Sequence, residues 1–173
     1  QQSKPMTKLS SDPVQNIIQA LQLDPHPKEQ GYFRRTYASE PMLGQGDASR
    51  HAMTSIYYLL TANQPVSYLH RNRSDILHYY HMGAPVHYVT FCEQDGLKYH
   101  VMGHDITNGQ QLQLLVKGGV WKASWIEGGK YGLISEAVVP GFDFRDNELA
   151  CIAYFSKYHP VVFDGLERFF PGS

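Results

Sequence analysis

The residues best suited to chemistry lie between positions 66 and 85, where His70 occupies a short β-type run, VSYLHRN. An imidazole on a strand can bind a divalent metal or accept a proton. A metal ion needs several convergent imidazole, carboxylate or thiolate ligands. The residues that follow His70 on this strand and at the start of the next include Asn72 and Ile76, which are not such ligands. Neither residue supplies a replacement charge, so we predict that no metal is bound at His70.

Lys122, in the later run KGGVWKASW, is the second candidate. Inside a pocket its ammonium group can bind a carboxylate or phosphate, or act as an acid with a lowered pKa. On an exposed strand it is only a solvated charge, and the sequence leaves both readings open. Trp121 and Trp125 alternate with Lys122 and Ser124, and we expect both tryptophans in the core.

Period-2 alternation along the strands indicates which side chains share an interior. If His70 faces the interior, Tyr68 and Val66 are expected on the same face. In the following strand Ile76, His78 and Tyr80 are expected to point inward, while Tyr79 and His81 point outward. The predicted ligand-binding residues are Ser55, Tyr57, His70, Ile76, His78, Tyr80 and Lys122.

Length and composition fit one compact domain that needs no disulfides. The chain has 173 residues, of which 42% are hydrophobic and 18% charged, and the formal net charge is −1. This charge argues against a nucleic-acid partner. No apolar run is long enough to span a membrane, and the polar N-terminus resembles no secretory leader, so we expect a cytoplasmic protein. Cys92 and Cys151 form no C-x-x-C pair and are expected to be reduced core residues.

The pattern of elements predicts a mainly β fold. Asp12-Pro13 is typical of a helix start and precedes VQNIIQALQL, whose apolar residues recur at helical spacing. From Gly31 onward, nine short β-rich runs are separated by turn residues, which favours a sandwich or barrel. Residues 147–170 lose this punctuation and are expected to form short helices over one end. We therefore predict an N-terminal tail at 1–12 and a single domain at 13–173.

Several of these runs resemble a known family. GYFRRTYAS, TSIYYLL, SDILHYYHMGAPV, KGGVWKASW and above all PGFDFRDNELA are similar to family 985 of the domains of unknown function, from about Val14 to Ala150. This family belongs to the cupin superfamily and is similar in shape to the sugar-nucleotide epimerase cupins. The resemblance implies a double-stranded β-helix, the cupin jelly-roll barrel, often as a dimer. Metal-binding cupins would have histidine at Asn72 and Lys122 and glutamate at Ile76. The family itself usually has glutamate at Ile76, tryptophan at His78 and proline at Lys117.

Two functional classes remain open. The first is a cupin that binds a small, partly apolar and anionic molecule inside the barrel, with no cofactor. The second is a metal-independent isomerase or epimerase acting on a sugar-nucleotide-like or other carbonyl substrate. In that scheme His70 removes a proton, Asp143 orients the imidazole, and Tyr57 or Tyr80 returns a proton. Asp143, within PGFDF, has an equally plausible structural role in capping the turn after Pro140-Gly141.

We also expect a homodimer. An exposed strand edge carries unpaired backbone groups, and pairing it with an identical edge satisfies both. The segment from Gly31 to Ala38 is the predicted contact with the partner's barrel.

Overall fold

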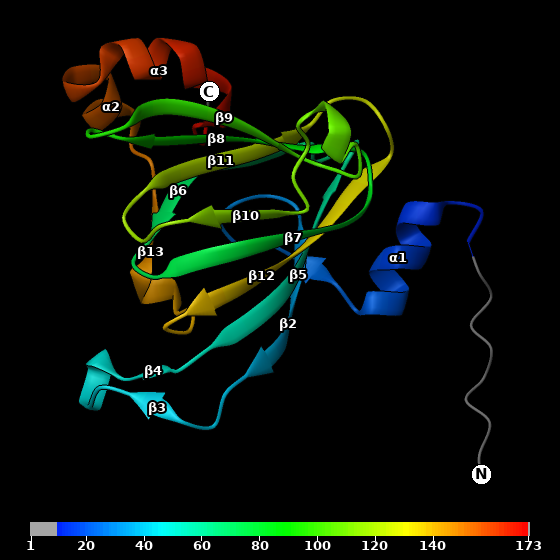
Figure 1. Ribbon diagram of the computed structural model, residues 1–173, viewed down its shortest axis with the longest axis horizontal. Helices are drawn as coiled ribbons and strands as arrows, with labels where there is room; N and C mark the ends of the chain where they lie inside the picture. The colour runs from blue at the N-terminus through cyan, green and yellow to red at the C-terminus, as the bar shows by residue number, and fades with distance from the viewer. Residues whose placement is uncertain (1–9, 173) are drawn as a thin grey trace.

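Two antiparallel sheets facing each other form the body of the protein in a computed structural model that describes residues 10–172 (Figure 1). The larger sheet has the order β1 (Asp24–Pro25), β2 (Tyr32–Ala38), β5 (Thr54–Thr61), β12 (Tyr131–Val139), β7 (Asp75–Gly83) and β10 (Gln113–Val116). The smaller has the order β13 (Asn147–Leu149), β6 (Val66–Asn72), β11 (Trp121–Ile126), β8 (Val86–Cys92) and β9 (Gly96–Met102). The sheets remain separate, in a jelly-roll-like arrangement that confirms the predicted fold class.

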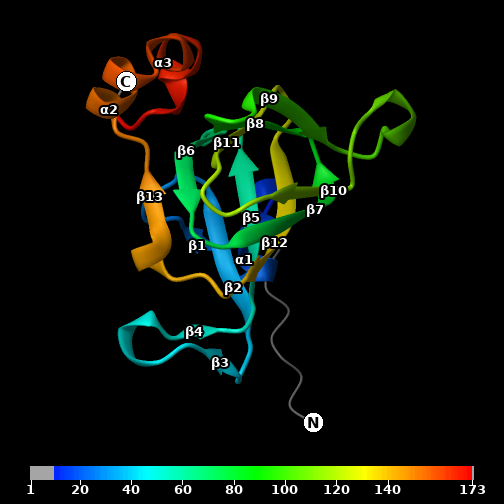
Figure 2. The same ribbon diagram turned by 60° about the vertical axis from the view of Figure 1, so that its left-hand side comes forward.

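A small hairpin and four 3-10 turns are the remaining elements among residues 10–172. The hairpin consists of β3 (Met42–Leu43) and β4 (Arg50–His51), and it projects from the lower end of the two sheets in Figure 2. The turns lie at Gly46–Ala48, Ile106–Asn108, Phe144–Asp146 and Glu167–Phe169. The turn at Phe144–Asp146 and the hairpin both border the cavity described below.

Three α-helices cover the outer faces of the sheets. Helix α1 (Pro13–Leu21) begins at Asp12, whose carboxylate accepts a hydrogen bond from Val14 N. It ends earlier than the sequence suggested, because Gln22 adopts a left-handed conformation with φ of 54°. Its apolar side packs against Leu59 and Leu133 on the larger sheet. Residues 1–9 of the predicted tail lie outside the described residues.

The C-terminal helices α2 (Ile152–Tyr158) and α3 (Pro160–Leu166) pack against the smaller sheet, as Figures 1 and 2 both show. Phe155 and Leu166 are fully buried against Trp121 and Trp125, so the expectation that both tryptophans are core residues is confirmed. The predicted short helices after residue 147 are also present. Among the described residues, no helix is long and apolar enough to cross a bilayer.

Alternation holds on β7 but fails on β6. Ile76, His78 and Tyr80 are buried on the inner side of β7, as predicted. On β6 the pairing with β11 shifts register between His70 and Ser67. This irregularity adds a residue to β6, so Val66 packs into the helix-covered layer rather than sharing the face of His70. The prediction that Val66 shares that face was therefore wrong.

Candidate functional site

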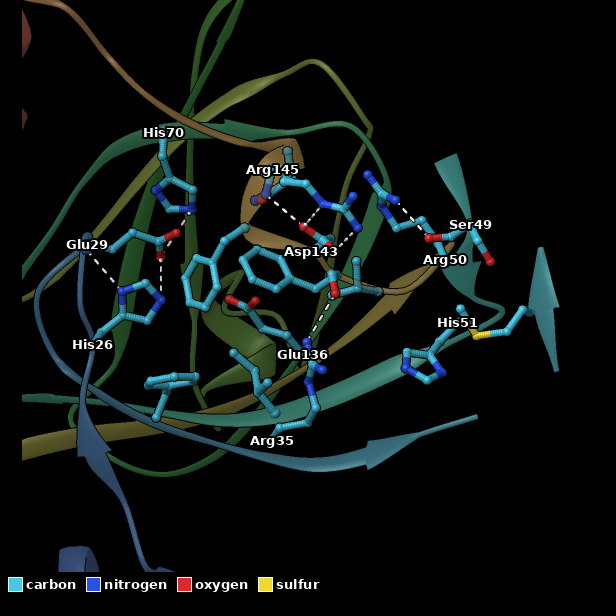
Figure 3. Close-up of a pocket in the computed structure, with 17 residues that line it drawn as sticks. His26, Glu29, Arg35, Ser49, Arg50, His51, His70, Glu136, Asp143 and Arg145 are labelled. Atoms are coloured by element: carbon cyan, nitrogen blue, oxygen red, sulfur yellow. Dashed lines mark hydrogen bonds and ion pairs between the residues drawn. The ribbon is translucent and has the colours of Figure 1, made fainter. Parts of the chain in front are cut away.

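A cavity of about 570 Å³ lies between the two sheets at the end bordered by the β3–β4 hairpin. Strands β2, β5, β6 and β12 supply its walls, and the connection between β1 and β2, residues 142–145 and the hairpin line the rest. Figure 3 shows the lining side chains. They are His26, Glu29, Phe33, Arg35, Met42, Ser49, Arg50, His51, Ile56, His70, Asn72, Glu136, Val138, Phe142, Asp143, Phe144 and Arg145.

One end of the cavity is formed by His26, Glu29 and His70 (Figure 3). His70 Nδ1 lies 2.7 Å from the Tyr68 carbonyl oxygen, and its Nε2 lies 3.5 Å from Glu29 Oε2. Since a carbonyl oxygen only accepts, His70 carries its proton on Nδ1. The Nε2 lone pair therefore faces the carboxylate and the cavity.

The neighbouring His26 has the opposite tautomer. Its Nδ1 accepts hydrogen bonds from the backbone N–H groups of Lys28 and Glu29, at 3.2 and 3.0 Å. In the neutral ring the proton is therefore on Nε2, which lies 3.8 Å from Glu29 Oε2. The two imidazoles thus present unlike atoms to one carboxylate, an acceptor from His70 and a donor from His26.

Glu29 is held in this place by strand β13. Asn147 Nδ2 donates to Glu29 Oε1 at 2.7 Å and to Asn72 Oδ1 at 3.2 Å. The other amide atom, Asn147 Oδ1, is buried and has no hydrogen-bond partner among the described residues. Asn147 therefore holds one oxygen of Glu29, while the other oxygen faces the lone pair of His70 Nε2.

A second polar group lies behind Glu136 in the core between the sheets. Lys122 Nζ lies 2.6 Å from His78 Nε2 and 3.3 Å from Glu136 Oε1. His78 Nδ1 lies 3.0 Å from the Leu114 carbonyl oxygen, which fixes its proton on Nδ1 and leaves Nε2 to accept from the lysine. Glu136 alone of the three lines the cavity, so its carboxylate connects the buried cation to the ligand space.

The opposite side of the cavity contains three arginines (Figure 3). Arg50 binds Asp146 through Nε and Nη2, at 2.7 and 3.0 Å, and Arg145 binds Asp143 through Nε and Nη2, at 2.9 and 2.8 Å. Arg35 differs from both, because it donates to the Phe142 carbonyl oxygen at 3.1 Å and has no carboxylate partner among residues 10–172. Its guanidinium is exposed and free to meet an anion.

The environment shifts the pKa of several of these groups. Burial lowers the pKa of His26 and of His70, although Glu29 opposes the shift in both. Burial, together with the adjacent Lys122 ammonium, lowers the pKa of His78. Burial alone would raise the pKa of Glu136, but Lys122 and His78 hold it well below its ordinary value. The site therefore combines neutral imidazoles with an ionised Glu136 at neutral pH.

The structure brings some of the sequence-predicted residues together and separates others. His70 lines the cavity, and Lys122 is its direct cross-strand partner, so the two predicted motif halves do meet. Ile76 and Lys122 are buried outside the main cavity, and His78 is buried beside Lys122. None of these three reaches the main cavity.

Three predicted wall residues lie elsewhere. Tyr80 belongs to the apolar core, and its hydroxyl donates to the Gly83 carbonyl oxygen. Ile56 lines the cavity, so its neighbours Ser55 and Tyr57 point to the outer face of β5, where Tyr57 packs near helix α1. The predicted inward orientation of Ser55 and Tyr57 was therefore wrong, and Tyr80, although inward, does not line the cavity.

Asp143 does line the cavity, but its partner is neither His70 nor Lys122. It binds the Arg145 side chain and accepts from Arg145 N at the start of the 3-10 turn, so the capping alternative fits its contacts. The Arg145 guanidinium lowers the pKa of the Asp143 carboxyl. The predicted orienting of His70 by Asp143 was wrong, and the Tyr68 carbonyl takes that place.

Sequence reasoning missed Glu29, Glu136 and Arg35. Glu136 had a readable signal, because alternation in YGLISEAVV places it with Ile134 and Val138 on one face of an apolar strand. Arg35 had a similar signal, two positions after Phe33 on β2. Glu29 lies in a connection between strands, where no periodicity indicates the direction of a side chain.

The donor set does not fit the metal centre of a metal-binding cupin. Asn72, Ile76 and Lys122 stand at the places of three ligands, and Lys122 is already paired with Glu136. The Nδ1 atom of His26 is engaged by backbone N–H groups and its Nε2 carries the proton, so this imidazole offers no lone pair. Among the described residues, no group of three His, Cys, Asp or Glu side chains is arranged to hold a metal ion.

We therefore expect purified protein to contain no stoichiometric metal at His70. Elemental analysis of wild type and His70→Ala checks this expectation. One equivalent of iron, manganese, nickel or zinc that disappears in the variant would contradict it.

The facing jelly-roll sheets around a polar cavity define a cupin-type protein. The family model described as Cupin superfamily (DUF985) matches residues 15–150, and the chain belongs to this family. It is 37% identical over 149 residues to the uncharacterized protein YML079W of Saccharomyces cerevisiae, covering 78% of this chain and 73% of that one.

Solved structures agree with this assignment. A hypothetical protein from Leishmania major is 30% identical, with a TM-score of 0.83 over 92% of this chain and 99% of that one. Protein SO0799 from Shewanella oneidensis is 28% identical, with a TM-score of 0.81 over 91% and 97%. An oxalate decarboxylase from Lactobacillus farciminis, 11% identical with a TM-score of 0.54 over 86% of this chain and 41% of that one, shares the fold alone.

Proposed function

We propose that the protein binds a small, partly apolar, anionic molecule in the cavity between its sheets. The observation that carries this proposal is the composition of the cavity wall. A space of about 570 Å³ lies within the range of small-molecule pockets, and its wall combines three phenylalanine rings with many polar and charged side chains. Arg35, which has no carboxylate partner among the described residues, is the proposed anion contact in place of Lys122, whose charge is used by Glu136.

A second candidate is the metal-independent isomerase or epimerase. One observation favours it: His70 is neutral, is anchored through Nδ1, and presents the Nε2 lone pair to the cavity, as a general base requires. The proposed proton donors Tyr57 and Tyr80 lie outside the cavity. The isomerase scheme therefore has a base without its expected acid, and we place binding first.

The two candidate functions predict different effects of substitutions at Arg35 and His70. The test uses a ligand that is retained from the native host and identified by mass spectrometry. Arg35→Met should weaken its binding about ten- to hundredfold, since one charge-assisted hydrogen bond is lost. His70→Asn should reduce affinity by only about 1 kcal/mol in a binding protein, but should abolish turnover in an isomerase. Calorimetric titration and a turnover assay with that ligand measure both effects.

Arg71→Met is the matched control, because Arg71 lies outside the cavity, paired with Glu148 and stacked on Trp121. It should leave affinity unchanged. Two results would contradict the assignment of the cavity as the binding site. One is an equal loss of affinity in the Arg35 and Arg71 variants, and the other is an unchanged affinity in both the Arg35 and the His70 variants.

We further propose that the protein is a homodimer joined through β2. Strand β1 pairs only with Tyr32 and Phe33, so the outer edge of β2 from Arg34 to Ala38 has no pairing strand among the described residues. A second copy would satisfy these backbone groups.

Light scattering at micromolar concentration should give about twice the chain mass of 19.7 kDa. Thr36→Pro, which places a proline within this edge segment, should shift the particle toward monomer. A monomeric wild-type particle would refute the proposal.

A further inference from the structure

We propose that the end of the cavity formed by His26, Glu29 and His70 binds a primary ammonium group, and that the ligand is an aminocarboxylate whose carboxylate is bound by Arg35. This inference rests on the proposed function and names the chemical class of the ligand. It follows from which hydrogen-bonding atoms at this end carry a hydrogen, and from the charges at the two ends of the cavity.

The first observation is a pair of facing acceptors. His70 donates through Nδ1 to the Tyr68 carbonyl oxygen, so its Nε2 has only a lone pair to offer. Glu29 Oε2, 3.5 Å away, is also an acceptor when the carboxyl is ionised. The His26 N–H lies 3.8 Å from the same carboxylate oxygen, which is too far for a hydrogen bond. Two facing acceptors require a group that can donate a hydrogen to each of them.

The second observation is charge. Glu29 is 8% exposed, and among residues 10–172 no lysine or arginine lies within ion-pair distance of it. Burial keeps both neighbouring imidazoles neutral at pH 7. A buried carboxylate without a cation is costly. A hydroxyl group or water can supply a hydrogen, but an ammonium group supplies three hydrogens and the missing positive charge.

The third observation is the opposite charge at the other side. Figure 3 shows Glu29 and His70 at one side of the cavity and Arg35, Arg50 and Arg145 away from them, with Glu136 between. Arg50 and Arg145 are neutralised by Asp146 and Asp143. Arg35 alone lacks such a partner, so the cavity has one anionic and one cationic end.

The wall between these ends combines hydrocarbon surface with the Glu136 carboxylate, which Lys122 neutralises. Phe33, Ile56, Val138, Phe142 and Phe144 contribute hydrocarbon surface. A ligand that matches all three regions has an ammonium group, a hydrocarbon body and a carboxylate. The chemistry fits an ω-amino acid or an aminomethyl aromatic acid better than a sugar, which would bury several hydroxyl groups against phenylalanine.

The free protein provides the first test. In Glu29→Gln the side-chain oxygen can still accept from Asn147, while the new amide N–H faces His70 Nε2 and supplies the missing donor. The His26 N–H, 3.8 Å from the replaced oxygen, makes no hydrogen bond that the change would remove. We expect the melting temperature to rise by about 2–4 °C. Glu148→Gln, the same change at an exposed acid, should not raise it. The ¹⁵N shifts of His70 at pH 7 should report the neutral Nδ1–H tautomer.

A charged His70 ring at pH 7, or a Glu29→Gln variant no more stable than wild type, would overturn the proposal, because the carboxylate would then already have its proton or its cation. Either result leaves the cavity available for other ligands, so the proposed function would survive.

The second test uses defined probes in amide and methyl NMR titrations of ¹⁵N- and ¹³C-labelled protein. These probes are 6-aminohexanoate, 4-(aminomethyl)benzoate, hexanoate and hexylamine. The two aminocarboxylates should bind about ten- to hundredfold more tightly than hexanoate or hexylamine. Glu29→Gln should remove the advantage over hexanoate, and Arg35→Met the advantage over hexylamine. Arg71→Met should change neither.

The outcomes distinguish a failure of the ammonium site from a failure of the proposed binding function. If hexanoate shifts the cavity resonances as strongly as 6-aminohexanoate, the cavity binds anions and the ammonium proposal fails. If neither aminocarboxylate shifts them, the ligand class is wrong, and the ligand retained from the native host then decides the proposed function independently.

Discussion

Replacing Lys122 with methionine should lower the free energy of unfolding by about 3–5 kcal/mol, the usual result of removing one partner of a buried ion pair. Lys122 is only 4% exposed, and its ammonium contacts both His78 and Glu136. Methionine preserves much of the apolar stem but leaves the Glu136 carboxylate without its cation and His78 Nε2 without a donor. Urea unfolding followed by tryptophan fluorescence measures the change.

Two variants make this prediction specific. Lys117→Met removes an exposed ion pair with Asp75, and it should change stability by less than about 1 kcal/mol. The double variant Lys122→Met/Glu136→Gln removes both charges and should recover much of the loss, because a buried neutral pair carries no uncompensated charge. An unchanged urea midpoint in Lys122→Met would show that this ion pair does not stabilise the fold.

The same geometry changes the expected role of Lys122. The sequence allowed a pocket lysine that binds an anionic ligand, or an exposed one. The structure places it one layer behind the cavity, where Glu136 separates it from the ligand space. Its effect on a ligand is therefore indirect, through the charge and position of Glu136.

Strand periodicity correctly predicted which side chains of a single regular strand face the interior. The inward side of β7 followed directly from alternation, with Ile76 and His78 buried. The meeting of His70 and Lys122 followed from the spacing of the two motif halves. The first conclusion depends on the regular backbone of β7, and the second on the resemblance to a known fold, because His70 and Lys122 pair next to the register shift.

The features that the sequence did not reveal depend on irregularity or on contacts between distant segments. The register shift between β6 and β11 reversed the expected face of Val66, because one extra residue changes the parity of the strand. Glu29 lies on a connection and is fixed by Asn147, 118 residues later in the chain. The sequence allowed Asp143 either to orient His70 or to cap a turn, and in the structure Arg145, two residues away, binds that carboxylate.

Acid should destabilise the protein well above the range where carboxylates titrate. His26, His70 and His78 have buried side chains, and burial lowers the pKa of each from the ordinary value of 6.5. Glu29 faces the first two and opposes this shift, whereas both Lys122 and Glu136 face His78. In the unfolded chain all three rings titrate normally, so below pH 6.5 the unfolded state binds more protons than the folded state.

This difference in bound protons means that the free energy of unfolding decreases as the pH falls. Stability is fully present above about pH 6.5 and falls as the pH drops below it, by up to about 1.4 kcal/mol per pH unit for each histidine that stays neutral in the fold. The ionised Glu136 adds a further loss only below the ordinary pKa of a glutamate, 4.5. Urea unfolding at pH 7.5, 6.5, 5.5 and 5.0, values chosen to bracket the histidine range, should show this early decline.

His26→Asn isolates one of the three contributions. The asparagine oxygen can replace Nδ1 as the acceptor for the backbone N–H groups of Lys28 and Glu29 but cannot titrate. The decline between pH 6.5 and 5.5 should become shallower by up to about 1.4 kcal/mol. His81→Asn, at a histidine exposed on the outer face of β7, should leave the slope unchanged. A wild-type stability that stays constant from pH 7.5 to 5.0 would mean that these buried histidines take up protons in the folded state.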